Sequence, residues 1–112
     1  RIENVRVFQP SETAFVERGL RQHNRISSFK RVFDRIYRIV RDDLPDLTVA
    51  MLNEYELTAE HLRTARDRYG AFTVAVITNP NGKATGSAKE VAEALGVEIL
   101  NWGTFFGRLN KK

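Results

Sequence analysis

The chain of 112 residues has a formal net charge of +4, with 42% hydrophobic and 29% charged residues. This length and composition fit a single domain over residues 1–112, and no apolar run approaches the ~18 residues of a membrane helix, so a membrane partner is not expected. Because cysteine is absent, a disulfide framework and a Cys-ligated metal are excluded, and cytoplasmic residence is the default expectation.

Most of the positive charge is concentrated in one segment. Residues 18–41 contain eight basic side chains and one acidic side chain, Asp34. The basic residues are Arg18, Arg21, Arg25, Lys30, Arg31, Arg35, Arg38 and Arg41. Such a segment suits a polyanion, and nucleic acid is the partner we expect. A solvated helix face, or a face that meets an acidic protein, explains the same residues and stays open.

The chain is predicted to begin with a short strand and a helix. Alternating valines predict the strand over residues 4–8. The helix is expected to start near Pro10, because proline and the polar residues after it favour a first turn. We expect it to break near residues 22–26.

Residues 27–42 have the clearest helical pattern. Their apolar side chains recur at spacings of three and four, namely Phe29, Val32, Phe33, Ile36, Ile39 and Val40. Arg31, Arg35 and Arg38 would then lie on the opposite, exposed face of this helix. The acidic pair and the proline of residues 42–45 are expected to end it.

The second half of the chain alternates strands and helices. Apolar runs predict strands over residues 47–52, 72–78 and 97–100. Helices are predicted over residues 59–69, from about 87 to 95, and from 104 to 109, the first of them capped by Thr58 and stopped by Gly70. This alternation implies right-handed parallel crossovers. The expected fold is a three-layer α/β/α arrangement with a small mixed or parallel sheet, which a Rossmann-like module would also have.

The stretch NPNGKATGS, residues 79–87, leads from a predicted strand into a helix. Free N–H groups at a helix start favour an anion, and Lys83 adds charge. Its glycines are misplaced for a P-loop, however, and Ser87 with Glu90 has the spacing of a capping box. A structural turn is therefore favoured. Lys83 and Ser87 remain the anion-binding candidates of a Rossmann-like module for a phosphorylated small molecule.

Several carboxylates bracket the predicted strand 47–52. Converging carboxylates can hold Mg²⁺ for phosphodiester hydrolysis, which makes Asp46, Glu54 and Glu56 the candidate catalytic residues of a nuclease. Solvated loop residues and a helix end explain them without a metal, and we favour that explanation. Outside the nuclease alternative no cofactor is expected.

Histidines and aromatic residues give weaker indications. His23 and His61 each lack a second histidine or cysteine at metal-ligand spacing. Stacking on bases is a role to consider for Tyr37, Tyr55, Tyr69 and Trp102. Aromatic residues at such positions more often belong to the core.

Residues 47–109 contain, in order, a buried strand, a helix ending RDRYG, the strand FTVAVITN, the helix ATGSAKEVAEALG and the segment VEILNWGTFFGRL. This succession resembles the C-terminal half of restriction-endonuclease-like domains, in particular the Mrr-like group. The basic segment 27–42 would match the usual first helix of that family.

The resemblance also implies where catalytic residues would stand. Activity in that family depends on an Asp and then E-x-K or Q-x-K on neighbouring strands. Met51, Leu52 and Asn53 occupy the positions where the acid and the lysine would be expected. The resemblance therefore implies a domain that binds DNA or RNA through phosphate contacts without its own catalytic activity. A homodimer or a place in a larger assembly stays open.

Overall fold

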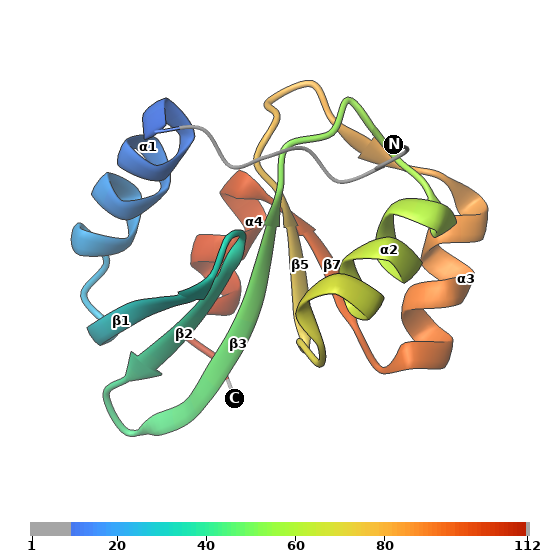
Figure 1. Ribbon diagram of the computed structural model, residues 1–112. Helices are drawn as coiled ribbons and strands as arrows, with labels where there is room; N and C mark the ends of the chain where they lie inside the picture. The colour runs from blue at the N-terminus through green and yellow to red at the C-terminus, as the bar shows by residue number, and fades with distance from the viewer. Residues whose placement is uncertain (1–9, 112) are drawn as a thin grey trace.

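The computed structural model describes residues 10–111, without the side chain of Pro10. Within this range four helices, a five-stranded sheet and a two-stranded sheet of β4 and β6 make up the fold (Figure 1). The elements are α1 Pro10–Arg21, β1 Ile26–Phe33, β2 Ile36–Arg41, β3 Leu44–Leu52, β4 Glu56–Leu57, α2 Ala59–Tyr69, β5 Val74–Ile77, β6 Lys83–Ala84, α3 Gly86–Leu95, β7 Glu98–Asn101 and α4 Trp102–Arg108. The strand predicted over residues 4–8 lies outside the described residues.

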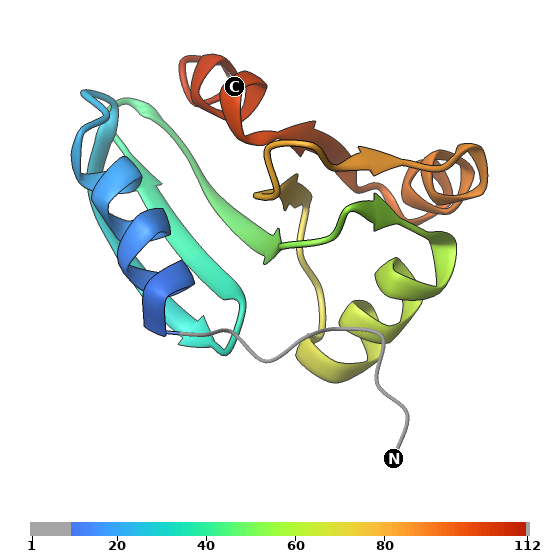
Figure 2. The same ribbon diagram turned by 90° about the horizontal axis from the view of Figure 1, so that it is seen from above.

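The main sheet is mixed and has the strand order β1-β2-β3-β5-β7. β1, β2 and β3 form an antiparallel meander, and β5 and β7 continue the sheet parallel to β3. α2 and α3 pack on one face, whereas α1 and α4 pack on the other (Figures 1 and 2). The prediction of an α/β fold with three layers and a mixed sheet is confirmed.

Each face of the sheet has its own apolar core. Leu62 of α2 and Ala88 of α3 lie in the cluster on one face, and Leu20 of α1 and Phe105 of α4 lie in the cluster on the other. All four side chains are fully buried. No helix of residues 10–111 has the length and apolar character needed to cross a bilayer.

The prediction of a helix over residues 27–42 is wrong, because this segment forms the hairpin of β1 and β2. Burial alternates along β2 from Tyr37 to Arg41, as it does in a strand with one face on a core. The segment is rich in β-branched and aromatic residues, which fit a pleated, half-buried surface. Arg41 is a polar residue at a buried position, so the alternation of buried and exposed residues along β2 cannot be recognised from the sequence.

The acidic residues expected to end that helix instead form the turn between β2 and β3. Asp42 and Asp43 make a two-residue connection, and Asp43 has a φ of 61°. Aspartate tolerates this left-handed conformation better than most residues do. Of the two residues only Asp43 has a positive φ, and the β2–β3 ladder shifts register between Ile39 and Arg41, so the turn is accompanied by a bulge.

The predicted ends of α2 are confirmed. The hydroxyl of Thr58 accepts a hydrogen bond from the N–H of His61, and Gly70 follows the helix with a φ of 85°. A residue with a side chain is strained at this φ, so glycine ends the helix at low cost.

The predicted Ser87–Glu90 capping box of α3 is wrong. Thr85 is the N-cap, and its Oγ1 accepts a hydrogen bond from the Ala88 N–H at 3.1 Å. The helix therefore begins at Gly86, one residue earlier than the sequence pattern indicated.

Candidate functional site

The candidate catalytic carboxylates do not converge. Asp46 lies in the first part of β3 and pairs with Arg38 at 3.6 Å, whereas Glu54 follows the opposite end of that strand. At about 3.3 Å per residue, these two positions are separated by roughly 25 Å of chain. A shared Mg²⁺ would need both within about 2–3 Å. Among residues 10–111, no three His, Asp or Glu side chains gather in a way that could hold a metal ion.

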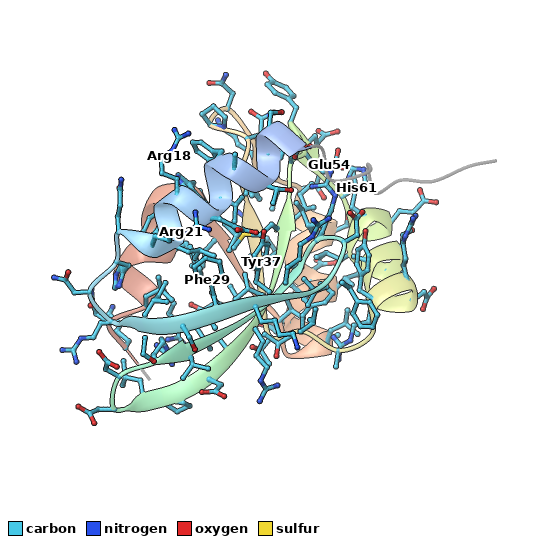
Figure 3. The ribbon with its side chains drawn as sticks, turned by 60° about the vertical axis from the view of Figure 1, so that its left-hand side comes forward. Arg18, Arg21, Phe29, Tyr37, Glu54 and His61 are labelled. Atoms are coloured by element: carbon cyan, nitrogen blue, oxygen red, sulfur yellow. The ribbon has the colours of Figure 1, made fainter. Side chains whose placement is uncertain are left out.

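Glu54 faces a histidine instead. Its Oε1 lies 3.7 Å from Nε2 of His61, near the start of α2 (Figure 3). Nδ1 of His61 accepts the N–H of Thr58 at 3.0 Å, so Nε2 carries the proton that points toward Glu54. This pair fixes α2 to the end of β3, whereas Glu56 is exposed on the short strand β4.

The loop of residues 79–85 uses its backbone donors within the protein. The N–H groups of Lys83 and Thr85 donate to carbonyls of Tyr55 and Leu57, which join β6 to β4. The N–H of Asn81 donates to the side chain of Asn79 at 2.9 Å. These donors are not aimed at an external phosphate.

Gly82 explains why this loop contains glycine. A Cβ at this position would lie 2.3 Å from the Glu54 carbonyl oxygen. Lys83 is exposed, and the hydroxyl of Ser87 lies 3.3 Å from that of Thr85. The hydrogen bonds of the stretch are those of a structural connection, and anion binding by Lys83 and Ser87 stays a prediction.

Two of the eight basic residues of the segment 18–41 are buried. Arg35 is 1% exposed and Arg41 is 3% exposed, so neither is available to a polyanion in this fold. Lys30 and Arg38 are opposite each other across β1 and β2, on the sheet face away from Tyr37 and α1. The single basic face expected from a helix therefore does not exist.

Arg35 connects α1 to the sheet. Its Nη1 donates to Oε2 of Glu12 at 3.4 Å and to the carbonyl of Met51 at 3.1 Å. The guanidinium neutralises Glu12, an acid beside the carboxyl end of β3 that lines a hollow there. A buried guanidinium held in this way by a carboxylate and a backbone carbonyl has a structural role.

Arg41 connects the β2–β3 turn to the end of the chain. Its guanidinium donates to the carbonyl of Pro45 at 2.8 and 3.0 Å and to that of Leu109 at 3.0 Å, and also to the carbonyl of Lys111. Burial lowers the pKa of Arg41, and the charge of Arg108 lowers it further. An arginine nevertheless stays protonated near neutral pH, so these bonds persist.

The exposed arginines near the end of α1 differ in their partners. Arg21 pairs with Glu17 at 3.3 Å, and its guanidinium carbon lies 5.7 Å from the centre of the Phe29 ring (Figure 3). Arg18 and Arg25 have no ion-pair partner within residues 10–111. These two are therefore the cations of this side that are most available to an external anion.

A groove runs beside Arg18 between α1 and α4. It consists of two adjoining hollows of about 390 and 430 Å³ that share Phe15 and Trp102. The first is lined by Phe15, Arg18, Gly19, Gln22, His23, Trp102 and Phe106. The second is lined by Ser11, Glu12, Phe15, Val16, Asn53, Thr78, Pro80 and Trp102. The second hollow lies at the carboxyl ends of β3 and β5, where open α/β sheets commonly bind ligands.

Aromatic rings line the middle of this groove. The ring centre of Trp102 lies 5.0 Å from that of Phe15 and 4.8 Å from that of Phe106, which it meets edge-on. Phe15 is 47% exposed. Gly19 leaves room for the indole, since a Cβ there would lie 2.6 Å from Cζ2 of Trp102.

His23 lines the groove with its ring but offers no free nitrogen. Its Nδ1 accepts the N–H of Arg25 at 3.1 Å, and its Nε2 lies 3.0 Å from the carbonyl of Phe106, to which it donates. The sequence pattern predicts Trp102 as a candidate for stacking on bases, whereas it does not predict Phe15. The signal available in the sequence was a glycine four residues after Phe15, within the same helix.

Comparisons of this chain with protein-family models, curated proteins and solved structures found no match. The function has to be inferred from the geometry of the arginines and the aromatic groove.

Proposed function

We propose that this chain is a nucleic-acid-associated domain of restriction-endonuclease-like type, which binds the phosphate backbone of DNA or RNA through arginines at the end of α1. The observation that carries the proposal is the exposure of Arg18 and Arg25 without ion-pair partners in residues 10–111, next to Arg21. Guanidinium groups bind phosphate oxygens through charge-assisted, bidentate hydrogen bonds. Such contacts supply affinity without reading sequence.

The order of the elements supports the proposed type at the level of fold class. The alternation of β3, α2, β5, α3, β7 and α4 follows the succession that the resemblance requires over residues 47–109. The helix before the sheet is α1, since residues 27–42 are a hairpin and do not match the family's first helix.

The domain is proposed to lack metal-dependent cleavage of its own. Asp46 and Glu54 lie at opposite ends of β3, and Arg35 neutralises Glu12. Met51 and Leu52, which stand where the resemblance expects an acid and a lysine, have side chains buried in the cores of opposite faces. These arrangements support binding without hydrolysis.

The experiment compares two double variants with equal charge loss. Arg18→Gln/Arg25→Gln removes two of the three proposed contacts and leaves Arg21, whereas Arg63→Gln/Lys89→Gln removes two exposed charges from α2 and α3 on the other side of the sheet. Binding to labelled single-stranded and duplex DNA is measured by fluorescence anisotropy at ~50 mM salt. We expect the first variant to bind roughly tenfold more weakly and the second to bind as the wild type does. Equal affinities of the two variants would contradict the proposal.

A cleavage assay tests the nuclease alternative on the same samples. Incubation of DNA with the wild-type chain and Mg²⁺ or Mn²⁺ is expected to leave the DNA intact. Cleavage that disappears in Glu54→Ala would instead support a catalytic role for that carboxylate.

A further inference from the structure

We infer that the groove between α1 and α4 binds an unstacked nucleobase, so that the nucleic acid bound here is single-stranded or locally unpaired. The inference rests on the proposed function for the phosphate contacts and on the groove for the base. The arginines alone would bind the phosphates of any nucleic acid, whereas a base site selects single-stranded or unpaired segments.

The floor of the groove has the character of a stacking platform. About half of the Phe15 surface is open to solvent, and this ring borders both hollows together with Trp102. Every base has a π-face, so bases stack on such rings with little dependence on sequence. A regular duplex keeps its bases stacked on one another and cannot offer a free face to Phe15.

The platform is formed before any ligand arrives. The ring of Trp102 packs on the rings of both Phe15 and Phe106, tilted to the first and edge-on to the second, and Gly19 lets it lie close to α1. Side chains held by packing lose little further freedom on binding, which favours affinity.

The charges around the rings indicate a base of a nucleic acid rather than an apolar peptide side chain. Arg18 lines the hollow that contains the rings, and Arg25 follows α1 without an ion-pair partner within residues 10–111. A strand whose base enters the groove carries a phosphate on each side of that base, and these two arginines complement that charge. An apolar peptide would leave both cations unused.

The polar groups and size of the groove also suit a base. Gln22 lines the first hollow, and its amide can both donate to and accept from a base edge. His23 contributes only its ring, because both of its nitrogens are engaged. A hollow of about 390 Å³ falls within the range of about 300–1,000 Å³ that is usual for sites of small organic groups.

The experiment uses Trp102 as the probe, since it is the only tryptophan in the chain. Oligothymidylate should change its fluorescence, and a duplex of the same length should not. Phe15→Ala should weaken binding of oligothymidylate by between about 5-fold and 150-fold, and leave duplex affinity unchanged. Phe15→Tyr keeps a ring at this position and should restore the affinity.

Phe33→Ala is the matched control, because Phe33 is 57% exposed on β1 and lines neither hollow. It should change neither affinity. Salt-dependent binding that is indifferent to Phe15→Ala would overturn the base site and leave the proposed function standing.

Adenosine, which carries a base and no phosphate, separates the two proposals. It should quench Trp102 in the wild type and not in Phe15→Ala. If adenosine quenches through Phe15 while no oligonucleotide binds, the proposed function is wrong and the groove remains a base site. If adenosine has no effect on Trp102 in the wild type, the base site is overturned.

Discussion

The indole of Trp102 packs across Gly19, where a Cβ would lie 2.6 Å from Cζ2 of the ring. A glycine inside a helix costs about 1 kcal/mol relative to alanine. At this position the missing side chain allows α4 to approach α1, and the aromatic rings of the groove depend on that approach. The relationship joins residues that are far apart in the sequence.

Gly19→Ala is therefore expected to destabilise the protein although alanine is the better helix former. Overpacking costs about 1–3 kcal/mol, and a value near the middle of this range, about 2 kcal/mol, exceeds the gain of about 1 kcal/mol in helix propensity. The displaced indole should also change its emission maximum. Both effects are measured in one denaturant titration followed by tryptophan fluorescence.

Gly107→Ala serves as the control for that substitution. Gly107 lies in α4, and a Cβ there would meet nothing within 4 Å. It should be neutral or stabilising by up to about 1 kcal/mol. If both glycine variants gain stability, the close packing of Trp102 on α1 does not hold.

Because Glu12 pairs with Arg35, substitution of Glu12 should lower the stability of the protein more than substitution of Glu60 does. Glu12 and Glu60 each lie in the first turn of a helix, where a negative charge is favourable. Glu60→Gln should lower the free energy of unfolding by less than about 1 kcal/mol, whereas Glu12→Gln should lower it by about 2 kcal/mol, because it also removes a charged hydrogen bond to the buried Arg35. Urea unfolding of the two variants measures the difference, and similar losses would argue against the buried pair.

Because Thr85 is the N-cap of α3, removal of the Thr85 hydroxyl should lower the stability of the protein more than removal of the Ser87 hydroxyl does. Thr85→Ala removes the acceptor of the Ala88 N–H and should cost about 1 kcal/mol. Ser87→Ala should cost little, because Ser87 is exposed and does not cap the helix. Thermal unfolding of both variants distinguishes them. A larger loss in Ser87→Ala would restore the capping box predicted from the sequence.

Alkaline pH should destabilise the protein through Tyr37. Burial raises the pKa of this phenol, and its hydrogen bond to Glu17 at 2.8 Å raises it further. The unfolded chain loses this proton near pH 10, while the folded chain retains it, so the stabilisation is complete below about pH 10 and falls above it. The expected slope from this group is up to about 1.4 kcal/mol per pH unit.

Tyr37→Phe should reduce that slope, and Tyr55→Phe should not, because Tyr55 is 70% exposed. Burial also raises the pKa of Tyr69, so the slope should be reduced in Tyr37→Phe rather than abolished. Unfolding free energies at several pH values above neutrality measure these slopes. Identical slopes in the wild type and Tyr37→Phe would contradict the account.

The main strands and helices of the second half of the fold could be predicted from the sequence, whereas the small sheet of β4 and β6 could not. Short apolar runs alternate there with capped helices, and local signals such as Thr58 and Gly70 coincide with the ends of α2. The hairpin at residues 26–41 was mispredicted because Arg35 and Arg41 lie inward, held by partners that are distant in the sequence. A pattern of apolar and polar residues assigns every arginine to the surface, so it cannot predict a buried arginine whose charge is paired within the protein.

The groove could not be predicted for a related reason. Phe15 and Trp102 belong to the first and last helices, and only the packing of both on one sheet face brings their rings together. The candidate catalytic carboxylates are an example of residues that are close in sequence and distant in the fold. Asp46 and Glu54 are close in sequence, yet an extended strand separates them.

The salt dependence of nucleic-acid binding tests the central claim most directly. If Arg18, Arg21 and Arg25 each neutralise a phosphate of a single strand, the logarithm of the association constant should fall linearly with that of the salt concentration, with a slope of about −2. The Arg18→Gln/Arg25→Gln variant should retain a slope of about −0.7. Binding that is indifferent to salt, or no binding at ~50 mM salt, would contradict the claim that this chain holds nucleic acid by its phosphates.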